Sequence, residues 1–219
     1  MKTHFLPHPS RLTQLKLWGL LLLWAGHPLP EAQIVVTEVM YHPQEQAGEE
    51  DTEKLEFIEL FNAGQKALSL EGLSFVEGVM FDFPTGAQLQ AGAYLIVAKN
   101  AQAIRDHYGI ENVMGNYEGS LDNNGETLRL VNGLGEGVTR FRYGTRGRWP
   151  ASADGAGDSL VLRQPLLNND DPESWTHSFL RGGSPGWQEP SSEADATEKR
   201  LIQLGSPGYY FKGTQEPSQ

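Results

Sequence analysis

The sequence predicts an all-β protein, folded as an antiparallel β-sandwich with one short helix. Short runs of β-branched and aromatic residues alternate with turn residues along most of the chain. The 25 glycines and 13 prolines among 219 residues exceed the usual share, which indicates many turns. Only one segment combines helical spacing with start and stop signals. Many short strands and a single helix are typical of two packed sheets.

Six segments have the composition of strands and end at Pro, Gly or Asn. The run 94–98 is apolar almost throughout, which predicts a strand buried on both faces. The run 138–143 alternates strictly, which predicts one exposed and one buried face. In chain order the predicted strands are 34–40, 55–61, 94–98, 127–131, 138–143 and 159–162.

The helix is predicted to begin after Asn100, whose side chain can cap it, and to end at Gly109. Two Asn-Gly pairs, at 124–125 and 132–133, favour the positive φ angles of tight hairpin turns. These signals place turns on both sides of the predicted strand 127–131.

The two ends of the chain differ from the middle. Basic residues precede a short apolar run at 17–26, and prolines and Ala32 follow it, so residues 1–32 are predicted to be an export signal. The apolar run is short for a bilayer span, and an uncleaved membrane anchor is the alternative. Residues 33–187 form the predicted sandwich domain. Residues 188–219 are predicted to be a polar linker and the start of a further module, as in a longer multidomain protein.

Composition excludes several classes of function. The chain has no cysteine, which excludes a disulfide framework, a thiolate zinc site and cysteine catalysis. Its formal net charge is −11, and removal of the basic leader would make it more acidic, so general nucleic-acid binding is disfavoured. An exported chain of this kind is expected in the periplasm, at the cell surface or outside the cell.

Several short motifs occur in a fixed order along 34–187. They include EVMYHP at 38–43, EFIELFN at 56–62, LDNNGETLRL at 121–130 and GGSPG at 182–186. The ordered set resembles the lamin tail domain family in its bacterial exported form. The resemblance implies an immunoglobulin-like β-sandwich, used as a non-enzymatic module without a cofactor. The nuclear role of lamins is not carried over, because the chain lacks coiled-coil heptads and has an export signal and an acidic surface.

The predicted function is therefore a non-enzymatic exported binding or spacer module that contacts proteins or cell-surface polysaccharide. The alternative is an accessory domain of an exported hydrolase or nuclease whose catalytic part lies outside this chain. A third interpretation, a carboxylate-based hydrolase within 33–187, requires a polar cleft that contains Glu38 and Glu59.

One basic stretch interrupts the acidic chain and supplies the candidate ligand-binding residues. Two of its arginines alternate with Phe141 and Tyr143 on a predicted strand, and arginine beside aromatic rings can hold polysaccharide, sulfate or phosphate groups. The alternative is an exposed strand face on which arginine stems cover apolar surface. The candidates are Arg129, Arg140, Arg142, Arg146 and Arg148.

No catalytic, cofactor-binding or metal-ligating residue is predicted. The GGSPG motif fits the serine-hydrolase pattern, but the residue after Ser184 is Pro185, which has no N–H for an oxyanion. Glu38, Glu56 and Glu59 are candidate carboxylates, yet the resemblance implies that they are structural and hydrogen-bonded to loop backbone.

The remaining chemistry-bearing residues are assigned to ordinary structural roles. His42, His107 and His177 lack metal-ligand spacing. The loops 154–158 and 168–171 offer oxygen ligands for calcium, but turns explain the same residues. Four aromatic residues are predicted to fill the core: Phe83, Tyr94, Trp149 and Trp175.

Overall fold

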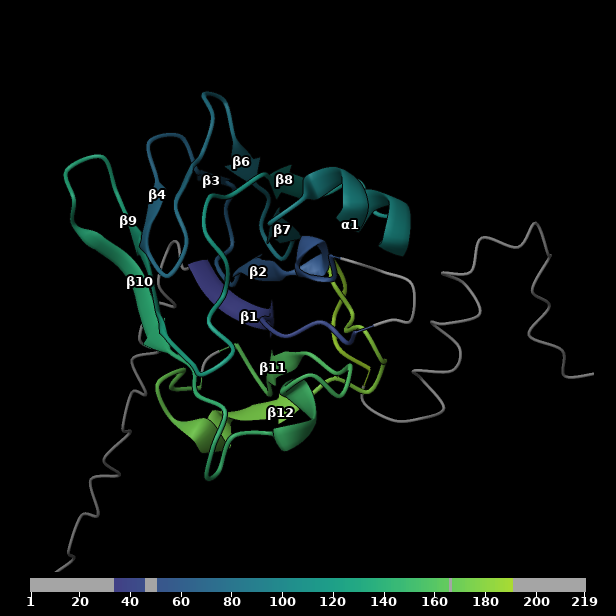
Figure 1. Ribbon diagram of the computed structural model, residues 1–219. Coiled ribbons are helices and arrows are strands. Elements are labelled where there is room, and N and C mark those ends of the chain that lie inside the picture. Colours follow the sequence, from purple (N-terminus) through teal and green to yellow (C-terminus); the bar gives the residue numbers. More distant parts are fainter. Residues whose placement is uncertain (1–33, 46–50, 166, 191–219) are drawn as a thin grey trace, which may run out of the picture.

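The computed structural model describes residues 34–45, 51–165 and 167–190 (Figure 1). Within them lie one α-helix, three 3₁₀ helices and twelve strands. The order is β1 (Ile34–Met40), η1 (Glu53–Leu55), β2 (Phe57–Asn62), β3 (Leu68–Ser69), β4 (Ser74–Glu77), β5 (Phe81–Asp82), β6 (Gln88–Leu89), β7 (Tyr94–Ala98), α1 (Ala101–Tyr108), β8 (Val113–Gly115), β9 (Thr127–Val131), β10 (Gly137–Arg142), η2 (Ala151–Ala153), β11 (Leu160–Leu162), η3 (Pro172–Ser174) and β12 (Trp175–His177).

The strands form two main sheets, which confirms the predicted β-sandwich. One sheet has the order β12-β11-β1-β2-β7-β8 and the other has the order β10-β9-β4-β5, while β3 and β6 pair separately. All described pairings are antiparallel except that of β7 with β8, which is parallel. The sandwich is therefore antiparallel as predicted, apart from this one parallel pairing at the edge of the six-stranded sheet.

Successive side chains along a strand point to opposite faces of the sheet, so the apolar side chains pack into two separate cores. On β7, Leu95 and Val97 belong to the main core between the sheets, together with Phe141 of β10. Ile96 and Ala98 point the other way, into a smaller core under α1. This confirms that the strand 94–98 is buried on both faces.

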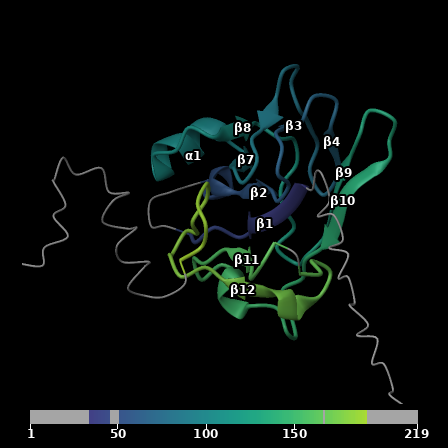
Figure 2. The same cartoon turned by 180° about the vertical axis from the view of Figure 1, so that it is seen from behind.

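The helix begins and ends as predicted. The Asn100 side chain accepts a hydrogen bond from the backbone N–H of Ala103, and Gly109 has the left-handed conformation at the end. Ile104 is fully buried in the smaller core. In Figures 1 and 2, α1 and the β9–β10 hairpin lie on opposite sides of β1 and β2. The helix therefore covers the face of the six-stranded sheet that is turned away from the second sheet.

Some local predictions were wrong. In the β9–β10 hairpin, Gly135 rather than Gly133 has positive φ, and the Asn132 side chain accepts hydrogen bonds from Leu134 and Glu136 N–H. The turn is thus wider than a two-residue Asn-Gly turn. The pair 124–125 forms a turn closed by Gly125 N–H to the Asp122 carbonyl, but it joins no two paired strands.

Of the aromatic residues assigned to the core, Trp175 is 1% exposed and Phe83 is 5% exposed. Trp149 and Tyr94 are only half-buried. The predicted leader 1–32 and most of the predicted linker 188–219 lie outside the described residues. Among the described residues, no helix is long and apolar enough to cross a membrane.

Two buried tyrosines give a matched test of the main core. Tyr41 is 1% exposed and its hydroxyl has no hydrogen-bond partner among the described residues, whereas the Tyr143 hydroxyl lies 3.0 Å from both the Asp122 carbonyl oxygen and Glu126 Oε1. We expect Tyr41→Phe to leave the free energy of unfolding unchanged or raise it by up to about 1 kcal/mol, because it removes an unsatisfied buried hydroxyl. Tyr143→Phe should lower it by about 1–2 kcal/mol. Urea unfolding of both variants checks this, and an equal loss in both would contradict it.

Candidate functional site

Three buried glutamates stand on or next to the two central strands. Glu38 of β1, Glu59 of β2 and Glu56 just before β2 are each 2% exposed. Glu38 and Glu59 are direct cross-strand partners in the sheet register. Burying a carboxyl group is costly unless donors satisfy its oxygens, so the contacts of these three groups define what they do.

Glu38 and Glu59 hold the segment after β12 against the sheet. Glu38 Oε1 accepts hydrogen bonds from Ser184 N–H at 3.0 Å and from the Ser159 hydroxyl. Glu59 accepts from Gly186 N–H at 2.7 Å and from the Thr37 hydroxyl at 2.7 Å. The GGSPG motif is therefore a turn anchored on two carboxyl groups.

Among the described residues, the surroundings of Ser184 differ from those of a serine-hydrolase nucleophile. Ser184 is 1% exposed, and its hydroxyl contacts Glu189 and Glu38. Neither a preceding strand nor a following helix flanks it directly within the part of the chain that the structure describes. Gly183 stands where any side chain would run into the Glu38 carboxyl group, which accounts for the second glycine of the motif.

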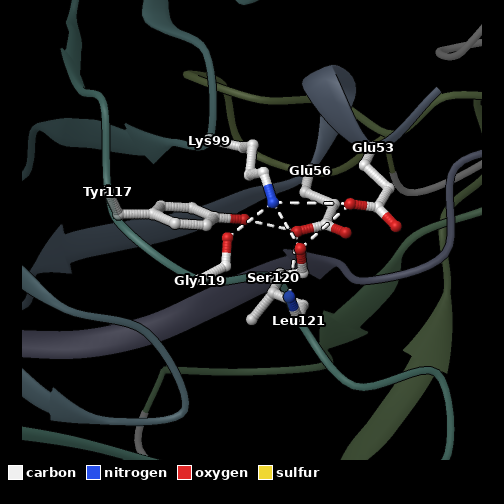
Figure 3. A network of polar contacts seen from close by, with 7 residues as sticks. All are labelled: Glu53, Glu56, Lys99, Tyr117, Gly119, Ser120 and Leu121. Atoms are coloured by element: carbon white, nitrogen blue, oxygen red, sulfur yellow. Dashed lines mark hydrogen bonds and ion pairs between the residues drawn. The ribbon is translucent and has the colours of Figure 1, made fainter. Parts of the chain in front are cut away.

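Glu56 holds a different segment in the same way (Figure 3). Its Oε2 accepts hydrogen bonds from the Tyr117 hydroxyl at 2.8 Å and from Leu121 N–H at 2.9 Å. Beside it, Lys99 Nζ donates to the Gly119 carbonyl at 2.5 Å and contacts the Ser120 hydroxyl, which also donates to Glu53 at 2.9 Å. Hydrogen bonds with Glu56 and with Lys99 thus hold the segment 117–121 against the six-stranded sheet.

Burial changes the acidity of all three glutamates. Loss of hydration raises the pKa of Glu38 to about 8, with a contribution from nearby Glu189, although the Ser159 and Ser184 donors lower it. The pKa of Glu59 is raised well above its usual value by burial and by its neighbour Glu38. Burial also raises the pKa of Glu56 to about 7. Burial therefore favours the neutral acid form of all three carboxyl groups.

A cavity of about 260 Å³ adjoins Glu38 and Glu59, and it is also lined by Tyr94, Trp187 and Glu189. A cleft beside these two glutamates is what the carboxylate-hydrolase interpretation required. However, at least one oxygen of each glutamate already accepts a hydrogen bond from the backbone of the 184–186 turn. The implied hydrogen bonds of these glutamates to loop backbone are therefore present in the structure.

The five candidate arginines are divided by the structure. Arg129 lies 3.4 Å from Glu77, and Arg148 lies 2.6 Å from Glu173, so both form ion pairs. The guanidinium groups of Arg140, Arg142 and Arg146 make no hydrogen bond or ion pair to the described residues. The sequence alone could not separate the arginines that form ion pairs from those that do not, and the ligand-binding role of this surface stays a prediction.

Arg140 and Arg142 lie on the exposed face of β10, with Phe141 buried between them. This confirms the predicted alternation of 138–143. Both arginines line a pocket of about 380 Å³, which we call the β10 pocket, together with Trp149 and Asp170 from the following loops. Arg146 and Arg148 are not among the residues that line it.

Two of the three histidines contact the acidic loops, and one acidic loop caps a 3₁₀ helix. His42 Nδ1 lies 2.8 Å from Asp154, His177 lies 3.5 Å from Asp158, and His107 is exposed on α1. Asp171 caps η3 through Glu173 N–H. Within the described residues, no group of three His, Cys, Asp or Glu side chains is placed to hold a metal ion.

The two-layer β architecture with one helix defines the class of this protein as an immunoglobulin-like β-sandwich domain. The Lamin Tail Domain family model matches residues 28–145, more than half of the chain. The chain belongs to the lamin tail domain family, as the ordered motifs indicated. Searches of curated proteins and of solved structures gave no match. The match ends before β11 and β12, yet both strands belong to the six-stranded sheet through the pairing of β11 with β1.

The raised pKa values predict that acid stabilises the domain. A carboxyl group whose pKa is higher in the folded state than its unfolded value of 4.5 contributes stability below pH 4.5 and loses that contribution as pH rises through the folded pKa. Between pH 4.5 and 8 we therefore expect the free energy of unfolding to fall as the pH rises, since each unit of difference between the folded and unfolded pKa is worth about 1.4 kcal/mol.

The measurement is chemical denaturation at pH 5, 6.5 and 8. Glu56→Gln keeps the acceptor oxygen for Tyr117 and Leu121 but cannot titrate. The free energy of unfolding of this variant should therefore depend less on pH, up to about pH 7, than that of the wild type. Glu111→Gln, which removes an exposed carboxylate, should keep the slope. Greater stability at pH 8 than at pH 5 would contradict the expectation.

Calcium is not expected to stabilise the domain, because the oxygen-rich loops are used in turns and contacts with histidine. We predict no change in melting temperature at millimolar calcium. Differential scanning fluorimetry with calcium, with magnesium as control, tests this. A calcium-specific rise of several degrees would show a site that binds the folded state.

Proposed function

We propose that this chain is a non-enzymatic exported module that binds protein or cell-surface polysaccharide through the exposed arginines of β10. The observation that carries the proposal is the pair Arg140 and Arg142, which line one pocket without a described ionic partner in a chain of net charge −11. Guanidinium groups are the side chains best suited to hold carboxylate, sulfate or phosphate oxygens.

The arrangement of the glutamates supports a non-enzymatic role. General acid–base chemistry needs carboxyl groups that are free to reach a substrate. Glu38, Glu56 and Glu59 are each 2% exposed and each accepts a backbone N–H. The family's immunoglobulin-like domains are generally non-catalytic, which agrees with this assignment.

The binding test is retention of the full chain on a cell-envelope fraction from the source organism. We expect Arg140→Glu combined with Arg142→Glu to lower retention about tenfold or more, because two attractive charges become repulsive. The matched control reverses Lys66 and Arg181, which are exposed elsewhere and give the same change in net charge.

The control variant should retain wild-type binding within about twofold. Equal loss in both variants would mean that net charge alone governs retention, and unchanged binding in both would remove the β10 surface from the function. Circular dichroism of each variant verifies that the sandwich remains folded.

A further inference from the structure

The β10 pocket combines chemical groups that an anion-binding patch alone does not need. Its volume of about 380 Å³ lies within the range of small-ligand sites. Its walls come from β9, β10 and the loops near 149 and 170. Four of its side chains determine which chemical groups the pocket offers to a ligand.

Arg140 and Arg142 supply the positive charge. They stand two residues apart on the same face of β10, and the cross-strand partner of Arg142 is Thr127, which also lines the pocket. Two guanidinium groups so placed can donate to the two oxygens of one carboxylate.

Trp149 supplies an aromatic surface and a hydrogen-bond donor. Its indole lies against Gly144, where a Cβ atom would be 2.7 Å from Nε1, and its ring packs 6.3 Å from that of the buried Trp175. The indole N–H has no hydrogen-bond partner among the described residues, and it is not among the buried unsatisfied atoms, so it reaches solvent. The ring is therefore held in place while its donor remains available at the pocket.

Asp170 supplies an acceptor, which separates this pocket from a simple anion site. Its Oδ1 accepts a hydrogen bond from the Arg142 backbone N–H at 3.1 Å, which fixes the carboxylate at the pocket wall. Oδ2 accepts no hydrogen bond from the described residues. A fixed carboxylate repels a dense polyanion, but it is a good acceptor for the hydroxyl groups of a sugar.

We propose that the β10 pocket binds an acidic sugar, a pyranose ring that carries one carboxylate and neighbouring hydroxyl groups, as in a uronic acid unit of a polysaccharide. Arg140 and Arg142 hold the carboxylate, Asp170 accepts from a hydroxyl, and the Trp149 indole packs against the ring and donates its N–H. This assignment rests on the proposed function, since it specifies the ligand of the same arginine surface.

Other anions fit the same groups less well. Sulfated or phosphorylated polymers carry dense charge, and both Asp170 and the net charge of −11 oppose them. A neutral saccharide would leave the two guanidinium groups without a partner. The combination of cations, one acceptor and an aromatic ring therefore selects for an anion that is also rich in hydroxyl groups.

The test measures binding of digalacturonate to the full chain by titration calorimetry. The comparison ligands are its methyl ester, which keeps the hydroxyl groups but loses the charge, inorganic phosphate and a heparin fragment. We expect digalacturonate to bind at least tenfold more tightly than the ester and than phosphate, since charge-assisted hydrogen bonds are lost in the first case and hydroxyl contacts in the second.

Variants assign the roles within the pocket. Arg140→Gln with Arg142→Gln should weaken digalacturonate binding about tenfold or more. Asp170→Asn keeps an acceptor for the Arg142 N–H, and it should reduce the preference for digalacturonate over phosphate. Lys66→Gln with Arg181→Gln is the matched control and should bind as the wild type does.

Tighter binding of heparin than of digalacturonate, or equal binding of the neutral ester, would overturn the acidic-sugar assignment. If digalacturonate does not bind while charge reversal at Arg140 and Arg142 still abolishes envelope retention, the sugar assignment fails and the proposed binding surface stands. If neither effect occurs, both fail.

Discussion

The sandwich depends on buried carboxyl groups that accept hydrogen bonds from distant parts of the chain. Glu38 and Glu59 join the 184–186 turn to β1 and β2, across separations of 146 and 127 residues in sequence. Glu56 joins the segment 117–121 to the same strands. An apolar side chain at these positions would fill space but would leave the loop N–H groups without acceptors, which costs about 1–3 kcal/mol for each buried group. The glutamates therefore determine which irregular segments cover the sheet.

This arrangement gives the acidic residues of the central strands a structural role. Position 38 lies opposite position 59, so two carboxyl groups share one buried face. Two adjacent negative charges are unfavourable in such a place, and burial together with their mutual repulsion favours at least one protonated form. A neutral carboxyl group still accepts hydrogen bonds from the turn, so the structural role does not require charge.

The sequence predicted the elements whose signals are local. β1, β7 and β9 matched in full because each is a run of apolar or β-branched residues, and α1 matched because Asn100 and Gly109 are local signals. β8 and β12 have three residues each and exist through pairing with β7 and β11, which no short window reveals. The alternation of 138–143 likewise predicted the exposed arginines. Trp149 and Asp170 reach the same pocket through loops, and only the folded structure brings them there.

The position of the arginines at a sheet edge also limits how a partner can be recognised. β10 is the edge strand of its sheet, and an exposed edge invites pairing with another strand. Here the Arg142 N–H donates a hydrogen bond to Asp170 Oδ1, so that this backbone group is not open to an added strand. The side chains of Arg140 and Arg142 place two positive charges on the same edge strand. Charged side chains and loop residues that cover an edge are among the means by which proteins discourage strand addition. Because these residues protect the backbone of the edge strand, a partner is recognised through side chains. This favours a small polar ligand over an added peptide strand.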